Sequence, residues 1–114
     1  MLPLTRRIQM GYTNYWNQER DFADDEWQLM QQEARYLKEL GFDVRIDVNN
    51  IYIDGESELM NLRRYKRTMK HYEEDNLAFN FCKTRMHKYD LAVWYLLCSC
   101  RQLIQDDFII WRDR

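Results

Sequence analysis

The sequence predicts an α+β fold, a two-layer sandwich in which two helices cover a mainly antiparallel sheet. Apolar residues recur at helical spacing in residues 25–40, and a second helix is expected over residues 90–105, whereas residues 42–54 alternate apolar and polar side chains with the period of a strand. The chain has 114 residues, which is the length of one domain. We therefore expect residues 1–114 to form a single α+β domain.

The first strand is predicted at Tyr12–Trp16, because this run is rich in aromatic and β-branched residues and follows Gly11. A helix is predicted next, with Asp24 as its N-cap and Gly41 just beyond its end. Its apolar stripe consists of Trp27, Met30, Ala34, Leu37 and Leu40. This spacing buries one side of the helix.

A β-hairpin is predicted over residues 42–54, where apolar and charged residues alternate. Asn49-Asn50 tolerates the positive φ of a two-residue hairpin turn, so Val48 and Ile51 are expected as the first cross-strand pair. In this register the apolar residues share one face of the sheet; they are Val44, Ile46, Val48, Ile51 and Ile53.

The second half of the chain predicts further strands and a second helix. Residues 59–65 fit either a helix or a short edge strand, and residues 71–76 are polar, as in a loop. Strands are expected at Phe79–Cys82 and at residues 108–111. The second helix lies between them, from Asp90 to about residue 105.

This second helix is apolar almost all round over Leu91–Cys100, although a helix on one face of a sheet needs a single apolar stripe. Another element must therefore cover its far side. Two covers remain open. One is the first helix, and the other is a second copy of the chain, in a homodimer in which Trp94 or Tyr95 meets its own copy.

Composition excludes several classes of protein. Seventeen Lys and Arg residues against nineteen Asp and Glu residues give a net charge of −2, which excludes a generally basic nucleic-acid coat, so direct nucleic-acid binding is not expected. The three Cys cannot all pair, and without a CxxC motif they do not make a structural zinc set. The chain also shows no secretory signal and no apolar run long enough for a bilayer. These features predict a cytoplasmic location without membrane association.

Two groups of basic residues are candidate anion sites. Residues 63–70 carry five positive charges interleaved with tyrosine, a pattern that fits either phosphate binding or a solvated surface. Lys83, Thr84 and Arg85 stand between a strand and a helix, where free backbone N–H groups and the helix dipole favour an anion. This stretch lacks the glycine-rich loop of a nucleotide triphosphatase.

Candidate catalytic residues are few. His71 and His87 are the only imidazoles, and neither lies in a recognised catalytic motif. Cys82 beside Phe81 has the pattern of a buried, unreactive thiol. Asp24, Asp25 and Glu26 are explained by a helix start. We therefore predict a protein that is not an enzyme and has no catalytic residue, no metal ligand and no cofactor.

With these motifs in view, the chain resembles a widespread family of small phage and prophage proteins of unassigned activity. The family pattern is a YTxYW strand, a helix start of the type D/E-E-W, and FCKTxxxPYD entering an apolar helix. The matching segments occur in the same order and together span most of the chain; they are Tyr12–Trp16, Asp25–Trp27, Phe81–Thr84 and Tyr89–Asp90. The chain departs from the pattern at Asn14, where the family often has His, and at Lys88, where it usually has Pro.

The resemblance implies a phage accessory protein that neutralises host antiviral defence by binding, with sequestration of a phosphate-bearing nucleotide as the leading hypothesis. The host cytoplasm is then its location. Lys83, Thr84 and Arg85 would hold phosphate, and Tyr89 and Asp90 would orient the ligand. A stacking face would come from Tyr12, Tyr15 or Trp16.

Other interpretations remain open. The chain could inhibit a host defence protein or a nucleic-acid-associated complex through the basic segment 63–70 or the helix 90–105, using a large flat surface. It could also be a small structural or interaction protein without a ligand. In that case Trp16 and Phe81 pack in the core and Asp90 caps the helix.

Overall fold

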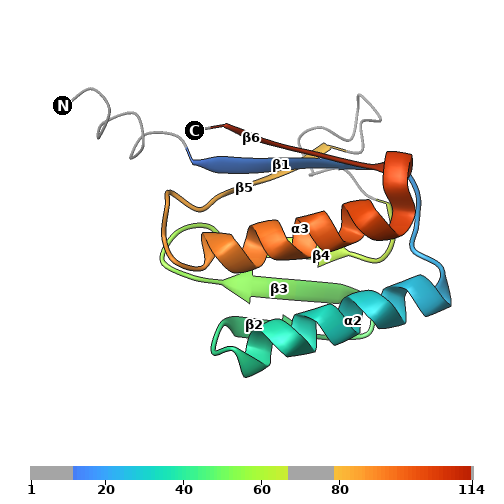
Figure 1. Cartoon of the computed structure of the whole chain (residues 1–114), viewed down its shortest axis with the longest axis horizontal. Coiled ribbons are helices and arrows are strands. Elements are labelled where there is room, and N and C mark those ends of the chain that lie inside the picture. The colour runs from blue at the N-terminus through green and yellow to red at the C-terminus, as the bar shows by residue number, and fades with distance from the viewer. Residues whose placement is uncertain (1–11, 67–78, 114) are drawn as a thin grey trace.

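The computed structural model of the chain describes residues 12–66 and 79–113 (Figure 1). Its strands are β1 (Thr13–Gln18), β2 (Asp43–Ile46), β3 (Asn50–Asp54), β4 (Met60–Arg63), β5 (Phe79–Lys83) and β6 (Phe108–Asp113). Its helices are α2 (Asp24–Glu39) and α3 (Asp90–Ile104), and the short 3-10 turn η2 (Gln105–Asp107) joins α3 to β6. The predicted α+β sandwich is confirmed.

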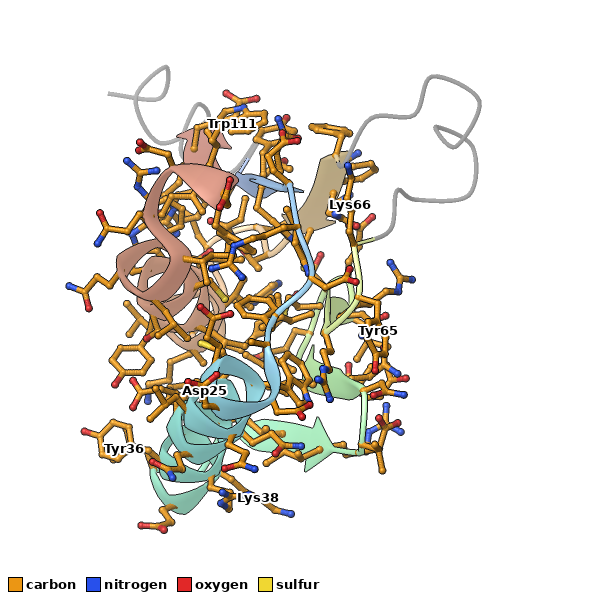
Figure 2. All side chains as sticks on the ribbon, turned by 90° about the vertical axis from the view of Figure 1, so that its right-hand side faces the viewer. Asp25, Tyr36, Lys38, Tyr65, Lys66 and Trp111 are labelled. Carbon is orange, nitrogen blue, oxygen red and sulfur yellow. The ribbon has the colours of Figure 1, made fainter. Side chains whose placement is uncertain are left out.

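The strands form two antiparallel sheets of three strands each. Sheet A has the order β5-β1-β6 and sheet B the order β2-β3-β4. The helices form the other layer, as Figure 2 shows, with the helices on one side and the strands on the other. Helix α3 packs against β1 and β6, and α2 packs against β2 and α3. No helix within the described residues is both long and apolar enough to span a membrane.

Helix α2 has the apolar stripe that its sequence predicts. The buried side chains are Trp27, Met30, Ala34 and Leu37, whereas Leu40 is 57% exposed just beyond the helix end. The predicted N-cap is wrong by one residue, because Ala23 is the N-cap and Asp24 is the first helical residue. The carboxylate of Asp24 instead pairs with Arg64.

The predicted hairpin exists, but its register is wrong by two residues. Ile46, not Val48, lies opposite Ile51. The turn is displaced by one residue: the Asp47 N–H donates to the Asn50 carbonyl at 2.9 Å, and the Asp47 carboxylate accepts hydrogen bonds from the backbone N–H groups of Asn49 (3.0 Å) and Asn50 (2.8 Å). Val48 is therefore left 75% exposed. A shift of two residues preserves the faces, so the rest of the apolar set stays on one side of the sheet.

The structure resolves the ambiguity over residues 59–65 in favour of an edge strand. Strand β4 pairs with β3, and Leu62 lies opposite Ile51. The predicted loop over residues 71–76 lies outside the described residues, and so do the basic residues Arg67 and Lys70.

Helix α2 covers the far side of α3. Within this contact the Sγ of Cys100 lies 3.9 Å from the Sδ of Met30, and the Tyr95 hydroxyl donates a 2.5 Å hydrogen bond to Glu33. The first of the two predicted covers is therefore the one observed. Of the two residues expected at a dimer contact, Tyr95 lies against α2 and Trp94 lies over the guanidinium of Arg112. A homodimer through α3 stays a prediction.

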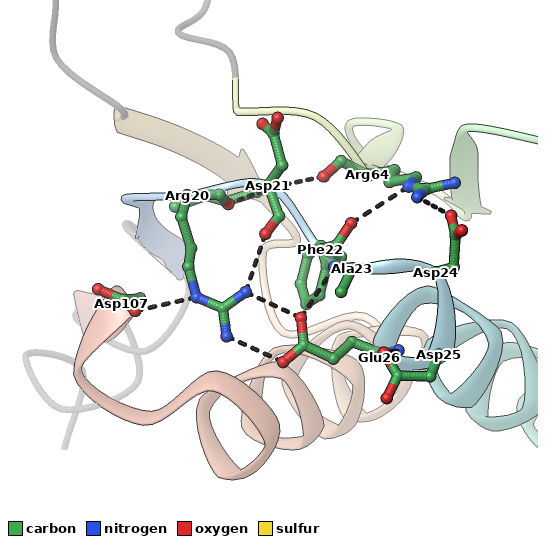
Figure 3. A network of polar contacts seen from close by, with 10 residues as sticks. Arg20, Asp21, Phe22, Ala23, Asp24, Asp25, Glu26, Arg64 and Asp107 are labelled. Atoms are coloured by element: carbon green, nitrogen blue, oxygen red, sulfur yellow. Dashed lines mark hydrogen bonds and ion pairs between the residues drawn. The ribbon is translucent and has the colours of Figure 1, made fainter.

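A polar clamp joins the two sheets, as Figure 3 shows. The segment between β1 and α2 bonds to the residues that follow β4: the N–H of Phe22 donates to the carbonyl of Arg64 at 2.9 Å, and Arg64 Nε donates back to the carbonyl of Phe22 at 3.2 Å. Arg20 completes the clamp with a bidentate ion pair to Glu26 and a hydrogen bond of 2.9 Å to Asp107. The start of α2 is thereby tied to both sheets.

Candidate functional site

Four polar side chains meet under sheet A and form what we call the Asp90 network: Asn14, Thr84, Asp90 and Arg112. The Asn14 amide donates to Asp90 Oδ1 at 2.8 Å, and the Thr84 hydroxyl donates to the same oxygen at 2.5 Å. Arg112 pairs with Asp90 Oδ2 and donates to Asn14 Oδ1 at 2.9 Å. The network is buried, since the side chains of Asp90 and Arg112 are 6% and 14% exposed.

Two aromatic rings enclose the guanidinium of Arg112. Its central carbon lies 4.6 Å from the ring centre of Tyr12 and 4.5 Å from that of Trp94. A cation held between two ring faces is stabilised by the electron density of those faces, and the rings also keep water away from the ion pair with Asp90. The Asp90 network thus has no free charge among its members.

Strand alternation brings these residues together. Asn14 and Arg112 are cross-strand partners on β1 and β6, and both face the helix layer. Asp90 is the first residue of α3, and the N-cap is Tyr89, which makes no side-chain capping bond. The interpretation of Asp90 as a helix cap is therefore wrong. Its carboxylate points across to sheet A instead of back to its own helix.

The expected anion cradle at Lys83, Thr84 and Arg85 does not have free backbone donors. The N–H groups of Thr84 and Arg85 both donate to the carbonyl of Tyr12, at 3.0 and 3.1 Å, and the N–H of Lys83 donates to Glu58 at 2.8 Å. The side chains of Lys83 and Arg85 are exposed at this corner. Any anion would therefore be held by side chains and not by the backbone.

Trp16 and Tyr89, expected at a ligand, lie inside the protein. Trp16 is 2% exposed in the core. Tyr89 is 4% exposed, its hydroxyl donates to the carbonyl of Glu58 at 2.8 Å, and burial raises its pKa to about 12. Its ring packs so closely on Gly55 that a Cβ at that position would overlap it. These two residues support the interpretation of the motifs as packing residues.

The outer face of sheet A carries a second group, which we call the aromatic face: Tyr15, Phe79, Phe81 and Trp111. Tyr15 lies opposite both Phe81 and Trp111 in the strand register. The Tyr15 and Trp111 rings stack at 5.4 Å with 10° between their planes, and the Tyr15 and Phe79 rings stack at 5.9 Å. The aromatic face points away from the helices, because neighbouring residues of these strands, such as Trp16, face the core.

The aromatic face is partly open to solvent and continues toward the edge of the sheet. Trp111 is 39% exposed and Ile109, two residues earlier on β6, is 43% exposed. Lys83 follows Phe81 on the same face of β5 and adds a positive charge at one corner. An apolar surface of aromatic residues with a charge at its margin has the composition of a binding interface.

Reactive groups are not prominent in the described residues. Burial raises the pKa of the Cys82 thiol to about 12 and that of Cys100 well above its ordinary value, so both are held as neutral thiols. Within residues 12–66 and 79–113 no group of three or more His, Cys, Asp or Glu side chains is placed to hold a metal ion. What these residues offer chemically is a binding surface and a buried polar network.

The structure brings together only some of the predicted site residues. Tyr12, Thr84 and Asp90 meet in or beside the Asp90 network, whereas Tyr15 and Lys83 lie on the aromatic face. Comparison of the chain with protein-family models, with curated proteins and with solved structures found no match. The site is therefore interpreted from its own geometry.

Sequence reasoning did not assign Arg112 and Trp94 to the site. A signal for Arg112 exists in β6: Phe108 and Ile110 alternate as inward residues, so Arg112 shares their face and needs a buried counter-charge. Trp94 is hidden in a helix that is apolar all round, and nothing in its spacing distinguishes it from core residues.

Proposed function

We propose that this protein is a phage-type accessory protein that neutralises host defence by binding a host protein through the aromatic face of sheet A. The observation that carries the proposal is the cross-strand cluster of the half-buried Tyr15 and Phe81 with the exposed Trp111, opposite the face that the helices cover. The resemblance to small phage proteins supplies the host context.

The arrangement of the rings favours a protein partner over a stacked base. Tyr15, the central ring, has Trp111 stacked against one side and Phe79 stacked near the other, so its ring faces are occupied within the cluster. Base stacking needs an open ring face. A protein surface packs well against ring edges, and aromatic residues provide much of the binding energy at such interfaces.

The Asp90 network supports this role by fixing the sheet. It ties β1, β5, β6 and α3 together from beneath, so the strands that carry the aromatic face are held in one register. A preorganised surface loses little entropy when it binds.

The proposal is tested by matched pull-down experiments from bacterial extract. The unmodified protein, Phe81→Ser on the aromatic face and Tyr36→Ser on α2 would each be immobilised, because Tyr36 is also an exposed aromatic residue, at 48%. We expect a host protein that is retained by the unmodified chain and by Tyr36→Ser and lost with Phe81→Ser. In calorimetry the purified host protein should then bind the unmodified chain and Tyr36→Ser with similar affinity and should bind Phe81→Ser more weakly. A host protein that is retained equally by Phe81→Ser and Tyr36→Ser would refute the role of the aromatic face.

Sequestration of a nucleotide is a second candidate function, favoured by one observation. The exposed side chains of Lys83 and Arg85 lie at the same corner of sheet A, next to the aromatic face. Two cations beside aromatic rings suit a phosphate and a base. A thermal-shift screen against cyclic and linear nucleotides tests this candidate, because a ligand that binds the native state raises the melting temperature.

A further inference from the structure

One edge of sheet A is unprotected. Strand β6 pairs with β1 along one side (Figure 1), and among residues 12–66 and 79–113 the backbone hydrogen bonds on its other side are confined to Phe108: its N–H donates to the Gln105 carbonyl, and its carbonyl accepts a long bond of 3.4 Å from Arg101. Because alternate residues of a strand direct their N–H and C=O groups to the same side, the backbone groups of Ile110 and Arg112 face this edge and are unpaired among the described residues. Such an edge is a template for another strand.

The other edges of the molecule are shorter or covered. The outer edge of β5 is covered by Glu58, whose N–H donates to the Lys83 carbonyl at 3.1 Å and whose carboxylate accepts from the Lys83 N–H. Strand β2 has only four residues, and the exposed Asp43 and Arg45 give it charges. These are the usual ways in which proteins prevent strands from pairing at an edge.

Strand β6 has such protection only at its last residue, the exposed Asp113. Its sequence, Phe-Ile-Ile-Trp-Arg-Asp, contains no Pro and no Lys, and Arg112 points inward and is neutralised by Asp90. The side chains on the outer face beside the open edge are Ile109 and Trp111, which are 43% and 39% exposed, followed by the exposed Asp113 at the end of the strand. Both the backbone and the side chains of this edge are therefore suited to burial against another strand.

We propose that β6 pairs antiparallel with β6 of a second copy, so that two copies of sheet A join into one six-stranded sheet. An edge strand can complement itself about a two-fold axis, since antiparallel pairing is the arrangement that this symmetry produces. A register that places Trp111 opposite Ile109 of the second copy, and Ile109 opposite its Trp111, covers the exposed apolar residues of both chains. The aromatic face then continues across the dimer.

Light scattering after gel filtration tests the dimer across a wide range of concentrations. The unmodified protein should have twice the mass of one chain, which is 14.3 kDa. Ile109→Lys should be monomeric, because it places a charge beside the pairing edge. The matched control is Val48→Lys, which adds the same charge at a 75% exposed loop position on sheet B and should stay dimeric. Circular dichroism would verify that both variants are folded.

Amide hydrogen exchange locates the interface independently of any substitution. Amides of β6 should become more protected as the concentration of unmodified protein rises, whereas amides in the exposed part of α3 should not change. A monomeric mass at every concentration would overturn the proposal. So would a dimer that persists in Ile109→Lys or that protects α3 and not β6. Neither result bears on the role of Phe81, so this test and that of the proposed function fail separately.

Discussion

The side-chain amide of Asn14 donates a 2.8 Å hydrogen bond to the carboxylate of Asp90, and this bond connects the first strand to the start of the last helix. The two residues are 76 positions apart in the sequence. The Asp90 carboxylate also accepts a hydrogen bond from Thr84, which directly follows β5, and pairs with Arg112 of β6. One carboxylate therefore connects all three strands of sheet A to α3. The stability of this part of the fold should depend strongly on that carboxylate.

Asp90→Ala is therefore expected to lower the free energy of unfolding by about 3 kcal/mol, because it leaves the buried cation of Arg112 without its partner. A helix cap alone would cost about 1 kcal/mol. Urea unfolding would measure the difference, with Asp25→Ala as the control, since Asp25 is an exposed acid in the first turn of α2. A double-mutant cycle with Arg112→Met should show strong coupling. A loss of unfolding free energy in Asp90→Ala that is close to the loss in Asp25→Ala would contradict the prediction.

Gly55→Ala is expected to destabilise the fold by about 1 to 3 kcal/mol, because the added methyl group overlaps the buried ring of Tyr89. Thermal unfolding would measure the change. Tyr89→Leu reduces the side chain at the point of overlap, so the double variant should lose less stability than the sum of the two single variants. If the stability losses of the two single variants were additive, the destabilisation by Gly55→Ala would not come from overlap with the Tyr89 ring.

The ion pair between Arg20 and Glu26 predicts a dependence of stability on pH. The hydrogen bonds from Arg20 lower the pKa of Glu26 from 4.5 to about 2, so the folded state favours the carboxylate. The contribution of Glu26 is then complete above pH 4.5 and is lost as the pH falls from 4.5 toward 2. It should amount to about 1 kcal/mol or less, because the Arg20 side chain is 40% exposed.

Denaturant unfolding of the unmodified protein and of Glu26→Gln across this pH range would measure that contribution. The difference in unfolding free energy between the two proteins should be present at neutral pH and should disappear near pH 2. Glu39→Gln, at the exposed end of α2, provides a control that removes one carboxylate charge from the same helix. If the difference in unfolding free energy between the unmodified protein and Glu26→Gln stayed constant with pH, the charge of Glu26 would not be the cause of that difference.

If the nucleotide candidate is correct, Lys83→Ala should weaken binding of the phosphate-bearing ligand by about 1.5 to 3 kcal/mol, as for a charged hydrogen bond. The melting temperature should hardly change, because the contact that Lys83 makes with Glu58 uses its backbone N–H. Isothermal titration would compare it with Lys88→Ala, another exposed lysine in the connection to α3. Equal losses of binding and stability would mark Lys83 as a structural residue.

Sequence periodicity predicted the elements well because it records local burial. The stripe of α2 and the alternation around Val44 and Ile53 appear in the structure as the sequence indicates. The register of the hairpin was missed because the Asp47 side chain forms part of the turn, which the apolar pattern does not record. The division into two sheets was also missed, because β1 pairs with β5 and β6, which lie far along the chain.

The candidate site was predicted in part, and for a similar reason. The motifs pointed to Thr84 and Asp90, yet in the structure these residues contact one another, and their polar groups are used within the fold. Tyr15 was expected at a stacking face and lies on the aromatic face. Its neighbour Trp111 was assigned only to a strand, since periodicity cannot say which side of a two-sided sheet a helix layer will cover.

The clamp of Arg20 and Arg64 has a consequence for how the molecule opens. Within the described residues the two sheets share no strand ladder, and the backbone hydrogen bonds that connect them are single ones, such as Phe22 to Arg64 and Glu58 to Lys83. Sub-global opening follows the weakest boundary between packed units. Because Arg20 and Arg64 hold that boundary with side-chain hydrogen bonds, they couple the two halves mechanically at the start of α2, and loss of these bonds would make local opening between sheet A and sheet B easier.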